Sequence, residues 1–168
     1  FVNFSLGLPY QSNESTLTAE EIKGTIVGVT HTGAIFTVMG LDLGKTCHIL
    51  VASCFGDGAM QVIHTESTPL MNVKTRFKEL RLQYRVRVSV VDSLPYTDVI
   101  MAMQEMDPHN LWACVYSEIT GTDMYVIKSR DENAEKGLRQ MRVVNVARDR
   151  TFDALLDFIR SGHLSKVT

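Results

Sequence analysis

The sequence predicts a mainly β fold: a five-stranded barrel followed by an α/β extension. Between residues 22 and 106, apolar segments with a period of two residues are separated by glycine-containing turns. One short amphipathic helical pattern falls between the third and fourth segments. Beyond residue 106, strand and helix patterns are mixed. The predicted organisation is a flexible arm over 1–21, a barrel over 22–106 and an α/β extension over 107–168.

The composition is that of a globular protein. Of the 168 residues, 45% are hydrophobic and 21% are charged, so the chain can bury a core without a metal or a disulfide scaffold. The net charge of −2 argues against general electrostatic attraction to nucleic acid. Cys47, Cys54 and Cys114 are odd in number and fit no metal-ligand spacing, which favours a reducing, intracellular compartment. No apolar run approaches the ~18 residues that span a bilayer, so no membrane association is expected.

The first half of the barrel consists of three predicted strands. Thr18 and Glu21 can cap a helical turn just before the first of them. The segment 31–33 forms a tight turn after that strand, and 52–72 reads as a loop punctuated by glycine and proline. The predicted strands are 22–30, 34–39 and 46–51.

The second half of the barrel begins with a helix. Val73, Phe77 and Leu80 fall at i, i+4 and i+7, the apolar stripe of a short helix with basic residues on its outer side. The fourth strand is predicted over 84–91, and alternating apolar residues predict a fifth over 99–103. Five strands with a helix between the third and fourth is the order of an OB-type barrel.

The extension contains three predicted features. Residues 112–119 and 124–128 are expected to pair as a hairpin, and 141–147 is a short strand. Thr151 can begin a helix that ends at Gly162. The apolar stripe of this helix is Phe152, Leu155, Leu156 and Ile159.

Five stretches, GTIVGV, GAIF, TCHIL, VRVSVVD and MAMQE, resemble in order and spacing the strand motifs of the S1 family of RNA-binding OB domains. The resemblance covers roughly half of the chain. The family's strand-three His falls on His48, and the Asp that closes its fourth strand falls on Asp92. Its stacking aromatic falls on Ile35, with Phe36 one place later, and Asp98 lies near the position of an expected arginine. The resemblance therefore implies the fold more strongly than the function.

The resemblance implies a non-catalytic module that binds single-stranded RNA within a larger ribonucleoprotein or transcription complex. Base stacking and cations along a groove are the means by which such modules bind. The alternative is an architectural subunit that has lost nucleic-acid affinity and docks on protein. Ile35, Asp98 and the acidic balance favour this alternative. The candidate RNA-binding residues are His48, Arg85, Arg87, Lys74, Arg76, Lys78, Arg81 and Phe36.

Nothing in the sequence predicts an enzyme. Cys47 and His48 are adjacent on a predicted strand and point to opposite faces, so they cannot act together. The glycine-containing turns lack the Lys-Ser/Thr of a phosphate-binding loop, and the carboxylates show no paired pattern. No catalytic residue, metal ligand or cofactor is therefore predicted.

Overall fold

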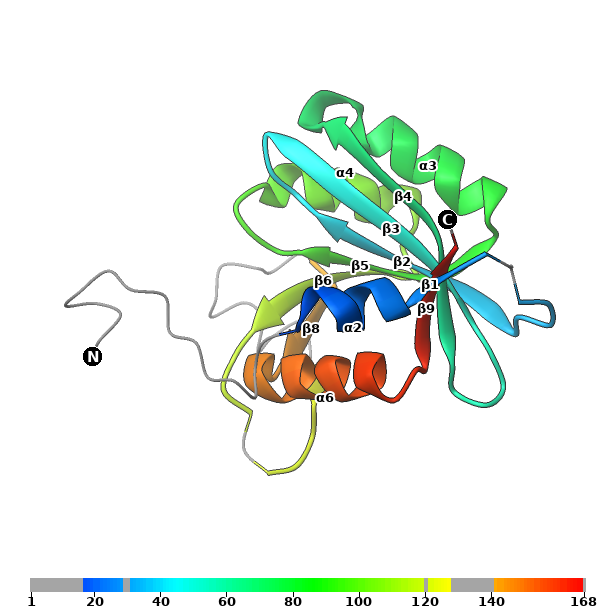
Figure 1. The fold of residues 1–168 in the computed structure, drawn as a ribbon. Helices are drawn as coiled ribbons and strands as arrows, with labels where there is room; N and C mark the ends of the chain where they lie inside the picture. Colours follow the sequence, from blue (N-terminus) through cyan, green and yellow to red (C-terminus); the bar gives the residue numbers. More distant parts are fainter. Residues whose placement is uncertain (1–16, 29–30, 120, 128–140, 168) are drawn as a thin grey trace, which may run out of the picture.

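The computed structural model describes residues 17–28, 31–119, 121–127 and 141–167. Within them, nine strands form one mixed sheet in the order β1-β9-β4-β3-β2-β5-β6-β8-β7 (Figure 1). Strands β3 and β7 run opposite to the others. The strands are β1 (Ile26–Val27), β2 (Phe36–Asp42), β3 (Thr46–Cys54), β4 (Met60–Pro69), β5 (Val86–Asp92), β6 (Leu111–Tyr116), β7 (Tyr125–Ile127), β8 (Val143–Val146) and β9 (Leu164–Val167).

Helices lie on both faces of the sheet. Figure 1 shows α3 and α4 together on one face, and α2 and α6 on the other. Within the described residues, no helix is long and apolar enough to cross a membrane. The helices are α2 (Ala19–Gly24), α3 (Val73–Gln83), α4 (Thr97–Met106) and α6 (Arg148–Arg160), with a 3-10 turn at Leu70–Asn72.

The main core lies between the sheet and helices α3 and α4. Along β2, Met39 and Leu41 are buried, whereas Asp42 is exposed, because successive strand residues face opposite sides of the sheet. Phe77 of α3 and Ile100 of α4 are fully buried in the same hydrophobic cluster. The helices therefore seal one face of the central strands, and the side chains that alternate with the core point to the other face.

The buried amide of Gln104 joins α4 to the neighbouring strands. Its Nε2 donates to the carbonyl oxygens of Leu111, at 3.2 Å, and Arg142, at 2.9 Å. Its Oε1 accepts from the Arg142 N–H at 3.0 Å. Removing this side chain would leave buried backbone groups without partners, which is costly, so Gln104 fixes the positions of β6 and the start of β8.

The predicted five-stranded barrel is wrong, because the structure has an open nine-stranded sheet. The segment 52–72, expected to be a loop, contains the ten-residue strand β4. The segment 99–103, expected to be a strand, lies in helix α4, where Ile100 and Met103 are buried at a helical spacing of three. In this short apolar run the same residues fit a period of two or of three to four, and packing against α3 and the sheet selects the helix.

Several local predictions are confirmed. Helix α3 buries Val73, Phe77 and Leu80 as its spacing indicates. Strands form in 46–51, 84–91 and 141–147, and a helix ends just before Gly162.

The predicted hairpin is wrong, and the predicted arm is largely outside the described residues. The segments 112–119 and 124–128 both contain strands, but each pairs with β8 instead of with the other. Most of the predicted arm over 1–21 lies outside the described residues, apart from a capping box in which Thr18 Oγ accepts from the Glu21 N–H at 3.1 Å. Strands from 22–106 and from 107–168 belong to the same sheet.

An ion pair links β4 to α3. Arg76 donates through Nε and Nη2 to the two carboxylate oxygens of Glu66, at 2.8 and 2.6 Å, and also contacts Glu79. His64 Nε2 lies 3.0 Å from Glu66. The hydrogen bond from Arg76 lowers the pKa of Glu66 to about 2, against the opposing effect of burial. The ionised form of Glu66 is therefore stabilised in the folded protein.

Replacing Arg76 with methionine is expected to lower the free energy of unfolding at pH 7. The loss is moderated because Arg76 is one-third exposed, where solvent screens its charge. Since the folded pKa of Glu66 lies below its unfolded value of about 4.3, this stabilisation is present above that value. It is lost as the pH falls toward 2. Urea unfolding of both proteins across this range tests the prediction, and a difference that does not change with pH would assign the loss to packing alone.

Candidate active site

Two aspartates end adjacent parallel strands. Asp42 is the last residue of β2, and Asp92 is the last residue of β5. Their predecessors Leu41 and Val91 are partners in the ladder and are both buried toward the helices. Asp42 and Asp92 therefore emerge side by side on the opposite face, on strands about 4.8 Å apart.

The flanking strands extend this pair into a row of polar side chains. His48 of β3 is the ladder partner of Asp42, and Cys114 of β6 is the ladder partner of Asp92. His48 is exposed, and its Nδ1 lies 2.9 Å from the hydroxyl of Ser67 on β4, which orients the ring. The row His48, Asp42, Asp92 and Cys114 thus crosses four neighbouring strands.

The electrostatics of β6 reflect its proximity to the carboxylates. Burial raises the pKa of the Cys114 thiol to about 11, and the charge of Asp92 acts in the same direction. Burial also raises the pKa of the Tyr116 phenol, with further contributions from Cys114, Asp92 and Asp42, while Arg148 of α6 opposes them. The charges of both carboxylates and of Arg148, at the start of α6, therefore act on the Tyr116 phenol.

An open groove lies beside Asp42. It has a volume of about 620 Å³ and is lined by β2, β3 and β4, including Gly40, Asp42 and His48. A Cβ placed on Gly40 would have no neighbour within 4 Å, so the missing side chain helps to keep this part of the sheet open. Asp42 is exposed at this groove and is accessible to a ligand.

The donor chemistry of the pair fits a hard divalent cation. Within the described part of the chain, neither Asp42 nor Asp92 takes part in an ion pair, and the Leu94 N–H donates to Asp92 at 3.5 Å. No three His, Cys, Asp or Glu side chains in that part converge closely enough to form a complete metal cage. Mg²⁺, however, is commonly held by only one or two carboxylates, with waters and substrate phosphate oxygens completing its shell. Asp149, in the first turn of α6, supplies a further carboxylate in the hollow beside Tyr116.

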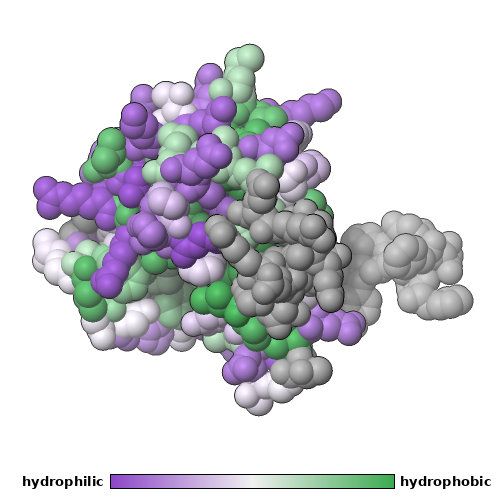
Figure 2. Space-filling view, turned by 180° about the vertical axis from the view of Figure 1, so that it is seen from behind, coloured by the Kyte–Doolittle hydropathy of each residue, from purple (hydrophilic) through white to green (hydrophobic). Residues whose placement is uncertain are grey.

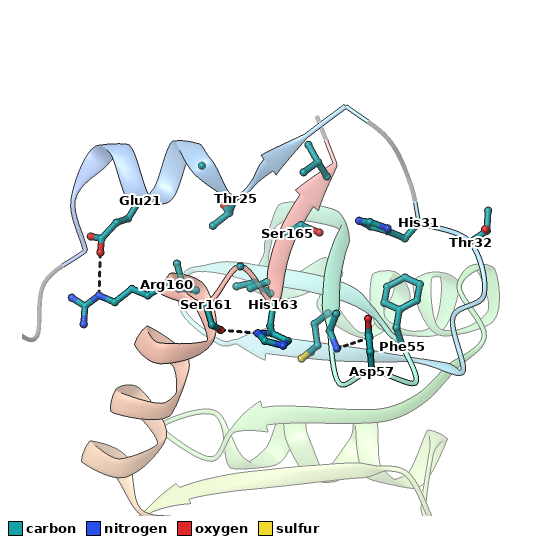
Figure 3. Close-up of a pocket in the computed structure, with 17 residues that line it drawn as sticks. Glu21, Thr25, His31, Thr32, Phe55, Asp57, Arg160, Ser161, His163 and Ser165 are labelled. Atoms are coloured by element: carbon teal, nitrogen blue, oxygen red, sulfur yellow. Dashed lines mark hydrogen bonds and ion pairs between the residues drawn. The ribbon is translucent and has the colours of Figure 1, made fainter.

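A larger pocket, of about 710 Å³, lies at the other end of the sheet, between α2, the loop after β3, the end of α6 and β9 (Figure 3). Its polar groups are paired locally. Asp57 accepts from the Ala59 N–H, His163 Nδ1 lies 2.7 Å from the Ser161 hydroxyl, and Arg160 pairs with Glu21. In open α/β sheets, ligands bind at the carboxyl ends of the strands, where Asp42 and Asp92 lie. We therefore favour the carboxylate pair, and not the larger pocket, as the reactive centre.

The residues predicted to bind RNA occupy separate places. His48 belongs to the polar row. Phe36 and Arg87 lie together, with the guanidinium 5.9 Å from the ring centroid, but at the opening ends of β2 and β5. Phe36 and Asp42 are the first and last residues of the seven-residue strand β2, about 20 Å apart. Arg85 precedes β5 in a turn with a φ of 51°.

The four predicted cations of α3 lie on the opposite face of the sheet from the aspartates. Lys74 and Lys78 are exposed, whereas Arg76 pairs with Glu66 and Arg81 Nε lies 2.8 Å from Asp107. Seen from behind, the upper part of the molecule, where α3 and α4 lie in Figure 1, exposes mainly hydrophilic side chains (Figure 2). The structure thus does not bring the predicted residues into one surface.

Sequence reasoning missed the two aspartates as a pair. Each closes an apolar strand, VMGLD and VSVVD, and this repeated ending was the available signal. Asp92 is named above only as a position of the S1 motif, and Asp42 is not among the candidate residues. The carboxylates show no paired pattern along the sequence, and it is the parallel pairing of β2 with β5 that places these two on neighbouring strands.

The central strand order β4-β3-β2-β5-β6, with antiparallel pairing up to β2 and parallel pairing beyond it, belongs to an RNase H-like α/β fold. Solved structures share this fold. The nuclease domain of human cytomegalovirus terminase, soaked with manganese, matches with a TM-score of 0.51 and 8% identity over 91% of this chain and 76% of that one. The large terminase nuclease of thermophilic phage G20c matches with a TM-score of 0.50 and 13% identity over 88% and 72%.

The large terminase of a second thermophilic bacteriophage has a TM-score of 0.51 and 7% identity over 86% of this chain. This chain spans only about a third of that protein, 32% of its length. No protein-family model matches the sequence, and no curated protein matches it significantly.

These likenesses correct the inferences that depended on the barrel. The resemblance to S1 domains does not hold, because the fold is RNase H-like and not an OB barrel. The predicted non-catalytic RNA-binding module loses its structural basis with it. The expectation that the chain is not an enzyme is likewise overturned, since the solved structures of this fold that it resembles are nucleases.

Proposed function

We propose that this chain is a metal-dependent nuclease that hydrolyses phosphodiester bonds of nucleic acid. The observation that carries the proposal is the pair Asp42 and Asp92, the first exposed and the second half-buried, side by side where two parallel strands end. The likeness in fold to terminase nucleases supports it. The two neighbouring carboxylates repel each other, and they also repel the phosphate of a substrate. A cation bound between them offsets both repulsions.

The residues of the chain have distinct roles in this proposal. Asp42 and Asp92 would hold the divalent cation, with waters and substrate phosphate oxygens completing its shell. When bound, such an ion polarises a phosphoryl oxygen and lowers the pKa of a bound water. In the tautomer in which His48 Nδ1 donates to Ser67, Nε2 would be left to accept a proton or to contribute a further ligand. The groove next to Gly40 gives the substrate backbone access to Asp42.

A cleavage assay with controlled metal content tests the proposal. Labelled DNA and RNA, each single-stranded and duplex, would be incubated with the protein in EDTA and then with added Mg²⁺ or Mn²⁺. We expect cleavage of at least one substrate with metal and none in EDTA. A folded protein that cleaves none of these substrates with either metal would contradict the proposal. Activity that persists in EDTA would contradict the metal requirement.

A further inference from the structure

An aromatic cluster with a cation lies at the same end of the sheet as the carboxylates. Tyr116, the last residue of β6, stacks with Phe152 of α6 at a centroid distance of 6.4 Å and an interplanar angle of 24°. The Arg148 guanidinium lies 5.8 Å from the centroid of each ring. The two rings hold each other in place, and Arg148 adds cation–π attraction to both.

The rings are exposed despite this packing. Tyr116 is 50% accessible and Phe152 is 46% accessible, whereas Phe77 in the core is fully buried. A hollow of about 380 Å³ opens beside Tyr116, between the end of β6 and the start of α6. Two acids, Glu118 and Asp149, and two arginines, Arg148 and Arg150, also line it, so its formal charges balance and it suits a flat, neutral group. Arg148, which lies over both rings, can pair with a phosphate attached to that group.

The cluster is close to the proposed reactive centre. Tyr116 lies two residues beyond Cys114, the ladder partner of Asp92, a distance of about 7 Å along the strand. The charges of Asp92 and Asp42 both act on the Tyr116 phenol. A nucleotide neighbouring a phosphate held at the carboxylates would therefore reach the ring.

We propose that Tyr116 and Phe152 form a stacking surface for an unpaired base, with Arg148 contacting its phosphate, so that the substrate strand is single-stranded where it crosses the active site. This inference rests on the proposed nuclease function and names its substrate class. In a duplex, both faces of a base are covered by its neighbours, so only an unpaired base is free to stack on these rings. A flat pair of rings with one cation also tolerates any base, so little sequence preference is expected.

Binding of a labelled oligothymidine, compared with a blunt duplex of the same length, tests the inference in EDTA, where no cleavage occurs. Tyr116→Ala is expected to weaken single-strand binding about 5- to 150-fold, the range that one base–aromatic stack supplies. Tyr116→Phe retains the ring and is expected to bind within about twofold of the wild type. Duplex binding is expected to be weaker in the wild type and unchanged in both variants. Phe36→Ala, which removes an exposed aromatic ring from the opposite end of the sheet, serves as the control and is expected to leave binding unchanged.

The outcomes separate this inference from the proposed function. Wild-type protein that binds neither probe, or binds the duplex as tightly, would overturn the stacking surface. Equal binding by a folded Tyr116→Ala variant would do the same, and Phe152→Leu gives an independent test if Tyr116→Ala does not fold. Loss of single-strand binding in Tyr116→Ala, in a protein that shows no cleavage with metal, would keep the stacking surface and reject the nuclease. Metal-dependent cleavage that is insensitive to Tyr116→Ala would keep the nuclease and reject the stacking surface.

Discussion

The Asp92→Asn variant is expected to cleave nucleic acid at least about a hundredfold more slowly than the wild type, with its fold intact. Asparagine keeps the shape of the side chain but replaces an anionic oxygen donor with a neutral amide. A hard cation then loses a charged ligand, and the stabilisation that it gives the transition state, several kcal/mol, falls accordingly. Initial rates at saturating Mn²⁺ measure the loss.

Thermal unfolding gives a second, independent readout of the same variant. Without metal, Asp92→Asn is expected to be as stable as the wild type or slightly more stable. The substitution removes a like-charge repulsion of about 1 kcal/mol or less between the neighbouring carboxylates of Asp42 and Asp92. Added Mn²⁺ raises the melting temperature of a protein that binds it only when folded. We therefore expect a metal-dependent rise in the wild type and a much smaller one in the variant.

Three companion variants make the result specific. Asp42→Asn is expected to behave as Asp92→Asn does, and the double variant is expected to be no slower than either, because the two residues act as a unit. Asp57→Asn is the matched control, since Asp57 is an exposed aspartate at the opposite end of the sheet and asparagine can keep its hydrogen bond to Ala59. If Asp42→Asn and Asp92→Asn both cleave at the rate of the wild type, this pair is not the reactive centre.

The local elements were predictable where one period dominates. Val73, Phe77 and Leu80 fit only a helix, and the alternation in 84–91 fits only a strand. The topology was not predictable from the same pattern. A period of two is the same in a closed barrel and in an open sheet, and the same for parallel and antiparallel pairing. The sheet is set by the long-range pairing of β2 with β5, which no local residue specifies.

The same limit explains the missed site. Asp42 and Asp92 are far apart in the sequence and meet only if their strands are parallel neighbours. The pattern of each strand alone does not say which strands are neighbours. Strand β4 was missed for a related reason: its polar run His64–Thr68 reads as a loop, yet the structure pairs it along the whole length of β3. His48 was selected for a role in RNA binding, and the structure places it opposite Asp42.

The Phe77→Ala variant is expected to lose about 3–5 kcal/mol of unfolding free energy, because it opens a cavity in a fully buried site. Phe77 packs in the cluster that also contains Leu41 and Val91, the residues that precede the two aspartates. At temperatures where the variant remains folded, cleavage per folded molecule is expected to stay close to that of the wild type, since the ladder between β2 and β5 does not involve Phe77. Urea unfolding and cleavage rates measured on the same samples separate the two effects.

Leu82→Ala is the matched control on the same helix. Leu82 is 66% exposed, and its truncation is expected to change stability by no more than about 0.5 kcal/mol. A similarly small loss for Phe77→Ala would mean that α3 does not seal the core against the sheet. A large loss of cleavage in a fully folded Phe77→Ala protein would mean that the spacing of Asp42 and Asp92 depends on core packing, and not on strand pairing alone. The two variants together decide whether the carboxylate pair is held by the backbone ladder or by the core beneath it.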